Sequence, residues 1–181
     1  MTPLPQNPNP GKTLERDTKN LAVWNRLGFP SLGMEHTFEV LAKLKKPWPT
    51  PVLINVGKNR TTANDEAHND YLAVMNRLNS LADIFVINIS SPNTVGLRDL
   101  QSANSLRQLL EKTVTTYRQQ NAGQARPILL KLSPDLNPTE LEAALKVSLE
   151  FDIDGWILAN TTLSRYEGCR FSKEGGVSGK P

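Results

Sequence analysis

The residues with the clearest chemical potential lie at the end of one apolar run, residues 84–89. Asn88 interrupts this run with an amide, and the hydroxyls of Ser90 and Ser91 follow it. A buried amide without a partner costs roughly 1–3 kcal/mol, so Asn88 is expected to bond a protein group or a ligand. Pro92 restricts Ser91 to extended backbone, which aims the Ser91 hydroxyl. These residues could form a reactive site, in which the backbone orients a hydroxyl beside an amide. A polar turn that closes a strand would use the same residue types.

The same arrangement recurs along the chain, because three further apolar runs end in a polar side chain. These are residues 52–56 with Asn55, residues 127–132 with Lys131, and residues 154–159 followed by Asn160. Such runs lack strict alternation, which is typical of strands buried on both faces of a parallel sheet. The carboxyl ends of parallel strands meet at one edge, so these polar groups are expected to converge on a ligand pocket.

Amphipathic stretches separate the apolar runs, and the alternation repeats roughly every 30 to 40 residues. Helices are predicted over residues 33–46, 64–82, 102–120 and 137–151. The last begins with a cap, a proline and a glutamate in the favoured order, at Asn137, Pro138 and Glu140. Strand–helix alternation predicts an α/β fold with right-handed crossovers, which both a closed barrel and a doubly wound open sheet would satisfy.

The N-terminal part of the chain has a different composition. Residues 1–20 are rich in Pro, Asn and charge, and we interpret them as an extended arm without a core of its own. Residues 21–24 form a short candidate strand. We interpret residues 21–181 as one domain.

Composition excludes several classes of function. The 181 residues carry a net charge of +3, and their basic residues are dispersed, so neither a nucleic-acid patch nor a polybasic membrane anchor is expected. No stretch has the roughly 20 apolar residues of a membrane span, and the N-terminus lacks a signal-peptide core. Cys169 is the single cysteine, and His36 and His68 lie far apart, so no disulfide and no metal site are expected.

The stretch at residues 88–98 (Asn-Ile-Ser-Ser-Pro-Asn-Thr-Val-Gly-Leu-Arg) resembles the active-site loop of dihydroorotate dehydrogenases. The resemblance is to class 2, the quinone-dependent, membrane-associated branch. Further matches follow the family's order at residues 25–29, 54–59, 130–136, 160–163 and 175–181. The resemblance implies a (β/α)8 TIM barrel that is incomplete in this chain, with about four to five of its βα units. We therefore expect residues 21–181 to be a partial βα barrel, the central part of a larger catalytic domain. The chain would then be an internal fragment that is inactive and soluble by itself.

The resemblance also implies an activity: oxidation of dihydroorotate to orotate, with FMN as hydride acceptor and a quinone as final electron acceptor, in de novo pyrimidine (UMP) biosynthesis. The full-length enzyme would lie peripherally on the inner membrane of a cell or mitochondrion, through N-terminal helices that are absent here. An inactive or truncated barrel remnant and another flavin-dependent pyrimidine oxidoreductase are the alternatives. A reading frame that continues past residue 181 into further βα units would favour the enzyme over the remnant.

Residue roles follow from the same resemblance. It implies that Ser91 is the catalytic base, because class 2 enzymes have serine where class 1 enzymes have cysteine, and that Thr94 and Phe29 flank a proton relay. The residues expected to bind substrate are Asn25, Arg26, Leu27, Gly28, Phe29, Asn88, Asn93, Asn160 and Thr161. The residues expected to bind FMN are Asn55, Asn88, Lys131 and Gly179.

These assignments are chemically sensible. Amide side chains offer both a donor and an acceptor to the imide edge of a pyrimidine, and a fixed cation favours a reduced, negatively charged flavin. Ala159 departs from the family, which usually has threonine there, and the loops that bind the FMN phosphate would lie beyond residue 181. Residues 175–181 do not match a nucleotide-binding P-loop, because the first glycine is wrongly spaced and Pro181 replaces the hydroxyl residue.

Overall fold

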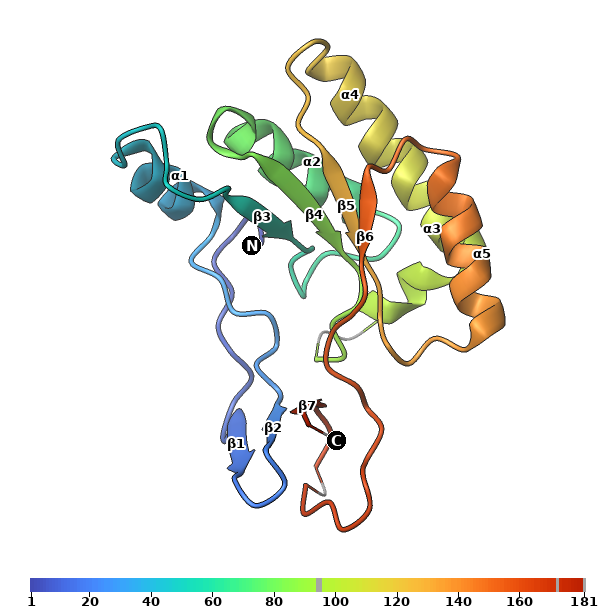
Figure 1. Ribbon diagram of the computed structural model, residues 1–181. Coiled ribbons are helices and arrows are strands. Elements are labelled where there is room, and N and C mark those ends of the chain that lie inside the picture. Colours follow the sequence, from blue (N-terminus) through green and yellow to red (C-terminus); the bar gives the residue numbers. More distant parts are fainter. Residues whose placement is uncertain (94–95, 172, 181) are drawn as a thin grey trace.

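The computed structural model describes residues 1–93, 96–171 and 173–180, and its larger part is a four-stranded parallel sheet (Figure 1). The strands are β3 (Leu53–Val56), β4 (Ile84–Asn88), β5 (Ile128–Lys131) and β6 (Gly155–Ile157), and they lie in the order of the sequence. Every neighbouring pair is parallel. The predicted strand–helix alternation and the parallel sheet are thus confirmed.

Helices cover one face of this sheet (Figure 1). They are α1 (Met34–Ala42), α2 (Ala67–Leu78), α3 (Ala103–Leu110), α4 (Thr116–Gln120) and α5 (Pro138–Leu149). A π-helical turn at Glu111–Thr115 joins α3 to α4, so the helix predicted over residues 102–120 is continuous. Short 3-10 turns occupy Asn79–Leu81 and Leu97–Gln101.

The main core lies between the sheet and these helices. Helix α2 turns Tyr71, Met75 and Leu78 fully inward, at the spacing of one helical face. Phe85 of β4 meets Tyr117 of α4 edge to face, with ring centroids 5.7 Å apart. Burying one such large apolar side chain contributes about 1.5–3 kcal/mol, so this layer holds the strand ends in fixed positions.

Helix α5 begins as its sequence predicts. The side chain of Asn137 accepts a hydrogen bond from the backbone N–H of Glu140, and the Glu140 carboxylate accepts one from the backbone N–H of Asn137, both at 2.9 Å. Pro138 occupies the first helical position, where no N–H is needed. This capping box fixes where the loop after β5 ends.

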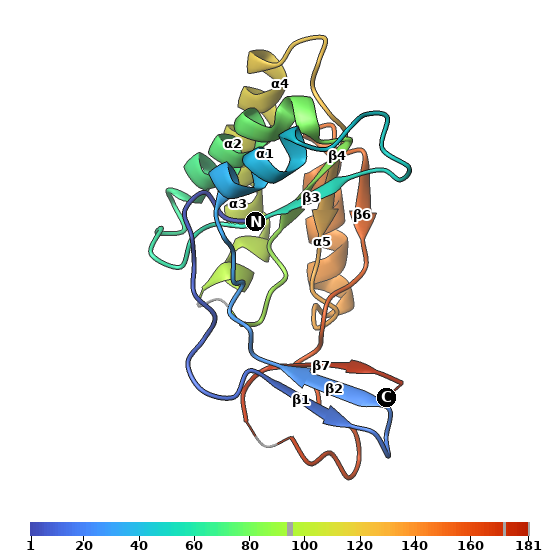
Figure 2. The same ribbon diagram turned by 90° about the vertical axis from the view of Figure 1, so that its left-hand side faces the viewer.

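A second, antiparallel sheet lies beyond the loops that follow the parallel strands (Figure 2). It consists of β1 (Leu14–Asp17), β2 (Ala22–Asn25) and β7 (Gly176–Gly179), with β2 in the middle. The candidate strand at residues 21–24 therefore belongs to this sheet and adds no fifth strand to the barrel. Its period-2 alternation explains the difference, because Ala22 and Trp24 point into a small separate core.

This small core contains Trp24, Phe171 and Val177, and the Trp24 and Phe171 rings stack with centroids 6.5 Å apart. The sequence predicts neither β1, which is mostly polar, nor β7, which is glycine-rich. Strand β1 lies within the segment interpreted as an extended arm. None of the helices in the described residues combines the length and hydrophobicity of a membrane span.

Candidate functional site

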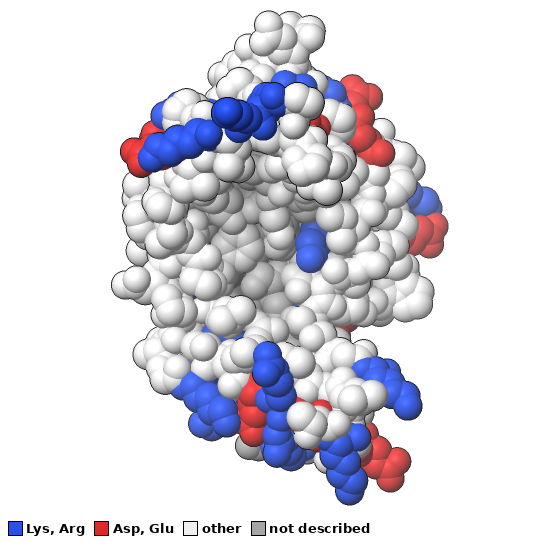
Figure 3. Space-filling model, turned by 60° about the vertical axis from the view of Figure 1, so that its left-hand side comes forward, with Lys and Arg blue, Asp and Glu red and all other residues white. Residues whose placement is uncertain are grey.

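A cavity of about 360 Å³ opens at the carboxyl ends of the parallel strands. Figure 3 shows this face hollowed between the two sheets, with most charged groups above and below the hollow. The lining residues are Met1, Asn25, Leu27, Gly28, Phe29, Pro30, Asn55, Asn88, Ser91, Pro92, Asn93, Lys131, Asn160 and Thr161. The four polar strand ends that the sequence predicts to converge thus border one space.

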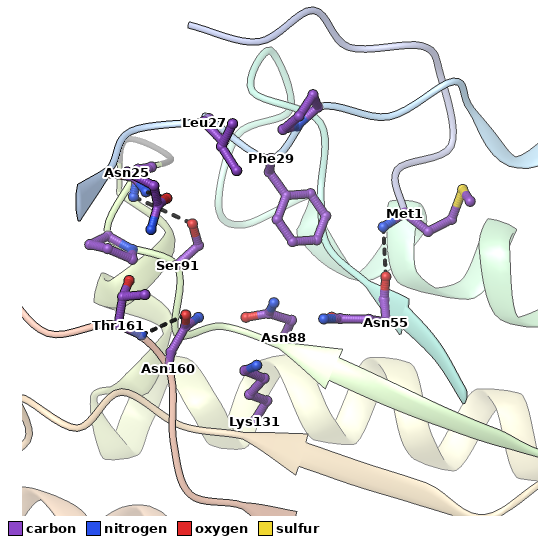
Figure 4. Close-up of a pocket in the computed structure, with 14 residues that line it drawn as sticks. Met1, Asn25, Leu27, Phe29, Asn55, Asn88, Ser91, Lys131, Asn160 and Thr161 are labelled. Atoms are coloured by element: carbon purple, nitrogen blue, oxygen red, sulfur yellow. Dashed lines mark hydrogen bonds between the residues drawn. The ribbon is translucent and has the colours of Figure 1, made fainter. Parts of the chain in front are cut away.

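The cavity has two walls that come from distant parts of the sequence (Figure 4). The parallel sheet supplies Asn55, Asn88 and Lys131 from the ends of β3, β4 and β5. The segment after β2 supplies Leu27 and Phe29 from the opposite side. A ligand in this space would be enclosed between a polar floor and a more apolar cover, which is the common build of small-molecule sites.

Ser90 fixes the orientation of two of the amides. The Oδ1 atom of Asn88 accepts hydrogen bonds from the backbone N–H of Ser90 at 3.0 Å and from its hydroxyl at 2.9 Å. Asn160 donates from Nδ2 to the same hydroxyl at 2.8 Å, and its Oδ1 accepts from the backbone N–H of Thr161 at 2.8 Å. Because a backbone N–H only donates, both amide orientations are determined. The NH2 group of Asn88 is therefore left to face the cavity.

Ser91 is in a different situation from Ser90. Its side chain lines the cavity, the residue is only 7% exposed, and its Oγ accepts a weak hydrogen bond of 3.4 Å from the backbone N–H of Asn93. The Ser90 hydroxyl is fully buried and is committed to Asn88 and Asn160. Of the two hydroxyls, Ser91 is the one that borders the cavity and has no strong hydrogen-bond partner within residues 1–93, 96–171 and 173–180.

A hydrogen bond joins the two walls of the cavity. Asn93, in the loop after β4, donates from Nδ2 to Oδ1 of Asn25 at 2.9 Å. Asn25 is the last residue of β2, so this bond ties the antiparallel sheet to the loop after β4 that carries Ser90 and Ser91. This bond orients the Asn25 amide, whose NH2 group has no partner among the described residues.

Phe29 has an uncommon backbone conformation, with φ of 56°, and it follows Gly28 at φ of 78°. A bulky residue with positive φ is held there by its surroundings and is often found at functional sites. The Phe29 ring lies so close to Gly57 that a Cβ atom on Gly57 would be 2.8 Å from it. The tight turn after β2 thus presses the Phe29 ring over the end of β3 (Figure 4).

Two features of the cavity suit a flavin. The Oδ1 atom of Asn55 is buried and has no hydrogen-bond partner among the described residues, so it is an acceptor waiting for a donor. Lys131 is the one charged side chain among the described lining residues, none of which is acidic. An N–H donor that also carries negative charge nearby would satisfy both groups, and a reduced isoalloxazine ring has these properties.

Two of the predicted site residues that the structure describes do not line this cavity. Arg26 lines an adjoining cavity of about 430 Å³ together with Asn9 and Arg60. Gly179 lies in β7, where an added Cβ would overlap the carbonyl oxygen of Leu21, so its smallness serves strand pairing. Thr94 lies outside the described residues.

Sequence reasoning missed other contributors. Met1, Pro30 and Pro92 also line the cavity, and no local pattern marks them. A polar network behind the site, centred on Arg98 and Asp135, was missed as well. Arg98 lies only seven residues after Ser91, and this closeness in sequence is the feature that could have pointed to it.

Comparisons with known proteins agree with this geometry. The family model described as dihydroorotate dehydrogenase matches residues 1–181. The chain is 42% identical over 185 residues to a dihydroorotate dehydrogenase (quinone) of Anaeromyxobacter sp. (strain Fw109-5), covering 100% of this chain and 50% of that protein. It is 40% identical over 185 residues to the enzyme of that name from Xylella fastidiosa (strain M12), covering 99% and 52%.

Solved structures give the same result for the fold. The chain superimposes on ligand-free DHODH from Eimeria tenella with a TM-score of 0.88 at 33% identity, covering 100% of this chain and 56% of that one. The complex of that protein with ferulenol gives a TM-score of 0.88 at 32% identity, covering 100% and 54%. The chain spans about half the length of the curated relatives it matches. Its parallel sheet is thus part of an α/β barrel, and the chain belongs to the dihydroorotate dehydrogenase family.

Proposed function

We propose that this chain supplies the substrate-oxidising site of a quinone-dependent dihydroorotate dehydrogenase, acting in pyrimidine biosynthesis. The single observation that carries the proposal is Ser91, a buried hydroxyl at the edge of an amide-lined cavity that has no strong hydrogen-bond partner among the described residues. The remaining half of the relatives' length would supply the rest of the barrel. We expect the isolated chain to be inactive.

Ser91 would take a proton from the ring carbon next to the one that loses a hydride. A serine hydroxyl is a weak base, so its own proton must pass onward as it accepts the new one. Phe29 shields this space from water on the side opposite the sheet (Figure 4). We assign Thr94 to the onward path by family resemblance.

The asparagines would hold the substrate. Asn88 and Asn25 each have their Oδ1 atom occupied by a protein donor, so each presents NH2 hydrogens to carbonyl or carboxylate oxygens of a pyrimidine. Asn93, Asn160 and Thr161 lie along the same wall. Fixed donors of this kind discriminate strongly, because a ligand without the matching acceptors leaves buried N–H groups unpaired.

We propose FMN as the cofactor, held by Asn55, Asn88 and Lys131. When bound, FMN accepts the hydride of the substrate. The unpaired Asn55 oxygen would accept a hydrogen bond from a ring N–H, and the Lys131 ammonium would lie near developing negative charge. We further propose a quinone as final electron acceptor and peripheral membrane contact through segments outside this chain.

The proposal is tested by anaerobic mixing of the full-length enzyme that contains this chain with candidate substrates. We expect bleaching of the bound flavin by dihydroorotate and not by dihydrouracil, which lacks the carboxylate, and we expect reoxidation by a soluble quinone. Bleaching by dihydrouracil alone would favour another pyrimidine oxidoreductase. A flavin-free protein that binds no orotate would favour the remnant.

Replacing Lys131 with methionine should weaken FMN retention and lower the reduction potential of the bound flavin, because the cation that favours the reduced ring is lost. Flavin content and a redox titration of the full-length enzyme measure both effects. Lys146→Met is the matched control, since Lys146 is an exposed residue of α5 paired with Glu142. Equal potentials in the two variants would remove Lys131 from the flavin site.

A further inference from the structure

Arg98 joins the loops that follow three parallel strands. Its Nε donates to the backbone carbonyl of Ser90 at 3.1 Å, in the loop after β4. Its Nη2 donates to the carbonyl of Thr161 at 3.2 Å, in the segment after β6. Its Nη1 forms a 2.7 Å ion pair with Asp135, in the loop after β5. One rigid guanidinium thus spans three separate segments of the site's frame.

Asp135 extends this network. Besides Arg98, its carboxylate accepts hydrogen bonds from the Thr162 hydroxyl and, at 2.9 Å, from the backbone N–H of Leu163. Burial opposes the charge, but the hydrogen bonds from Thr162, Leu163 and Arg98 outweigh it and hold the pKa of the Asp135 carboxyl below its ordinary value. The carboxylate is therefore ionised at neutral pH and keeps its pairing with Arg98.

The backbone groups that Arg98 holds belong to residues next to the reacting groups. Ser90 precedes Ser91 and fixes the amides of Asn88 and Asn160, while Thr161 itself lines the cavity. Arg98 and Asp135 do not line the cavity. Any effect they have on the reaction must pass through the positions of other residues.

We infer that Arg98 is a positioning residue for this reaction, which holds the Ser90–Ser91 backbone at a fixed distance from Thr161 and Asn160. The inference rests on the proposed function. Geometry distinguishes it from a simple surface ion pair. The pair of Arg107 with Glu150 has the same 2.7 Å separation, but its side chains are 43% and 47% exposed, against 20% and 21% for Arg98 and Asp135.

The test compares Arg98→Met with Arg107→Met in the full-length enzyme, at a temperature where both are folded. Stopped-flow reduction of bound FMN at saturating dihydroorotate measures the chemical step. Since a displacement of about 1 Å at a reacting group lowers rates by up to about 100-fold, Arg98→Met should slow reduction roughly 10- to 100-fold. Arg107→Met should react at the wild-type rate. Equal rates for the two variants would overturn the inference.

Three further variants separate positioning from general stability. Arg98→Lys should recover part of the rate, because an ammonium still reaches Asp135 but does not bridge two carbonyl groups. If Arg98→Met loses its flavin, Asp135→Asn gives the same comparison with a smaller loss of rate, and a wild-type rate for Asp135→Asn would then count against the inference.

In a Ser91→Ala background, Arg98→Met should lower the reduction rate by less than about threefold, because the hydroxyl that Arg98 positions is already absent. A full additional 10-fold loss there would show that Arg98 does not act through Ser91.

Failure of the inference is distinguishable from failure of the proposed function. If dihydroorotate does not reduce the wild-type flavin, the proposed function fails. The inference is then decided by the crystal structure of Arg98→Met. A Ser91 Oγ shifted by about 1 Å relative to Asn160 supports it, and an unmoved Ser91 overturns it.

Discussion

Ser91→Ala in the full-length enzyme should slow the reduction of FMN by dihydroorotate at least ~10²-fold, the lower range for losing general-base catalysis. FMN content and orotate affinity should stay near wild type, because the one hydrogen bond that the Ser91 hydroxyl makes with the described part of the chain is weak. Anaerobic stopped-flow mixing across pH isolates this step from quinone turnover. An unchanged reduction rate would remove Ser91 as the base and with it the class 2 mechanism.

The neighbouring serine provides the matched control. Ser90→Ala removes the hydroxyl that bonds both Asn88 and Asn160, so it should weaken orotate binding more than it slows the reduction of a saturated enzyme. Ser91→Cys should keep part of the activity with a pH profile shifted to lower pH, because a thiol titrates below a hydroxyl. If both alanine variants reduced their flavin at nearly the wild-type rate, the serines would be ordinary turn residues.

Gly176→Ala should lower the efficiency of flavin reduction by about 10²-fold, although Gly176 belongs to the antiparallel sheet. A Cβ atom there would overlap the Thr161 hydroxyl and come within 2.5 Å of the Thr161 Cβ. Because Thr161 is β-branched and follows Asn160 directly, the clash must displace both residues from the cavity wall. The efficiency is measured as the reduction rate per unit dihydroorotate at low concentration.

Gly155→Ala in β6 is the control for adding a methyl group, since its Cβ would meet only the end of the Leu129 side chain, at 3.1 Å. We expect a small loss of stability and no loss of rate. The double variant Gly176→Ala/Thr161→Gly should react like Thr161→Gly alone, because glycine removes both the hydroxyl and the Cβ atom of residue 161 with which the added methyl group clashes. Additive losses in the double variant would mean that Gly176 acts elsewhere.

The parallel half of the fold was predictable because its information is local. Each strand is a contiguous apolar run, each helix has its own buried face, and Asn137 and Glu140 sit three residues apart, at the spacing of a capping box. The convergence of Asn88 and Lys131 at one cavity follows from the same regularity, since parallel neighbours end at one edge.

The antiparallel sheet was not predictable in the same way. Strand β7 pairs with β2 from the other end of the chain, and its Gly-Val-Ser-Gly sequence has too few apolar residues to show a period. The pairing of Gly179 with Ala22 is not visible locally either, because the two residues lie near opposite ends of the chain. Arg98 went unnoticed for a related reason, since its three partners come from three different loops.

The pairing of β2 with β7 has a consequence for the order in which the molecule assembles. The parallel units form from neighbouring segments, whereas a contact of this sheet such as Tyr166 with Asp17 joins residues 149 positions apart. Closing a flexible loop of that length has an entropic cost of roughly 4 kcal/mol. The closure is expected late, after the local units have formed. During synthesis, Asn25 can therefore take its place opposite Thr161 only after residues 176–179 have left the ribosome. The parallel sheet and its helices are thus expected to fold before the cavity is complete.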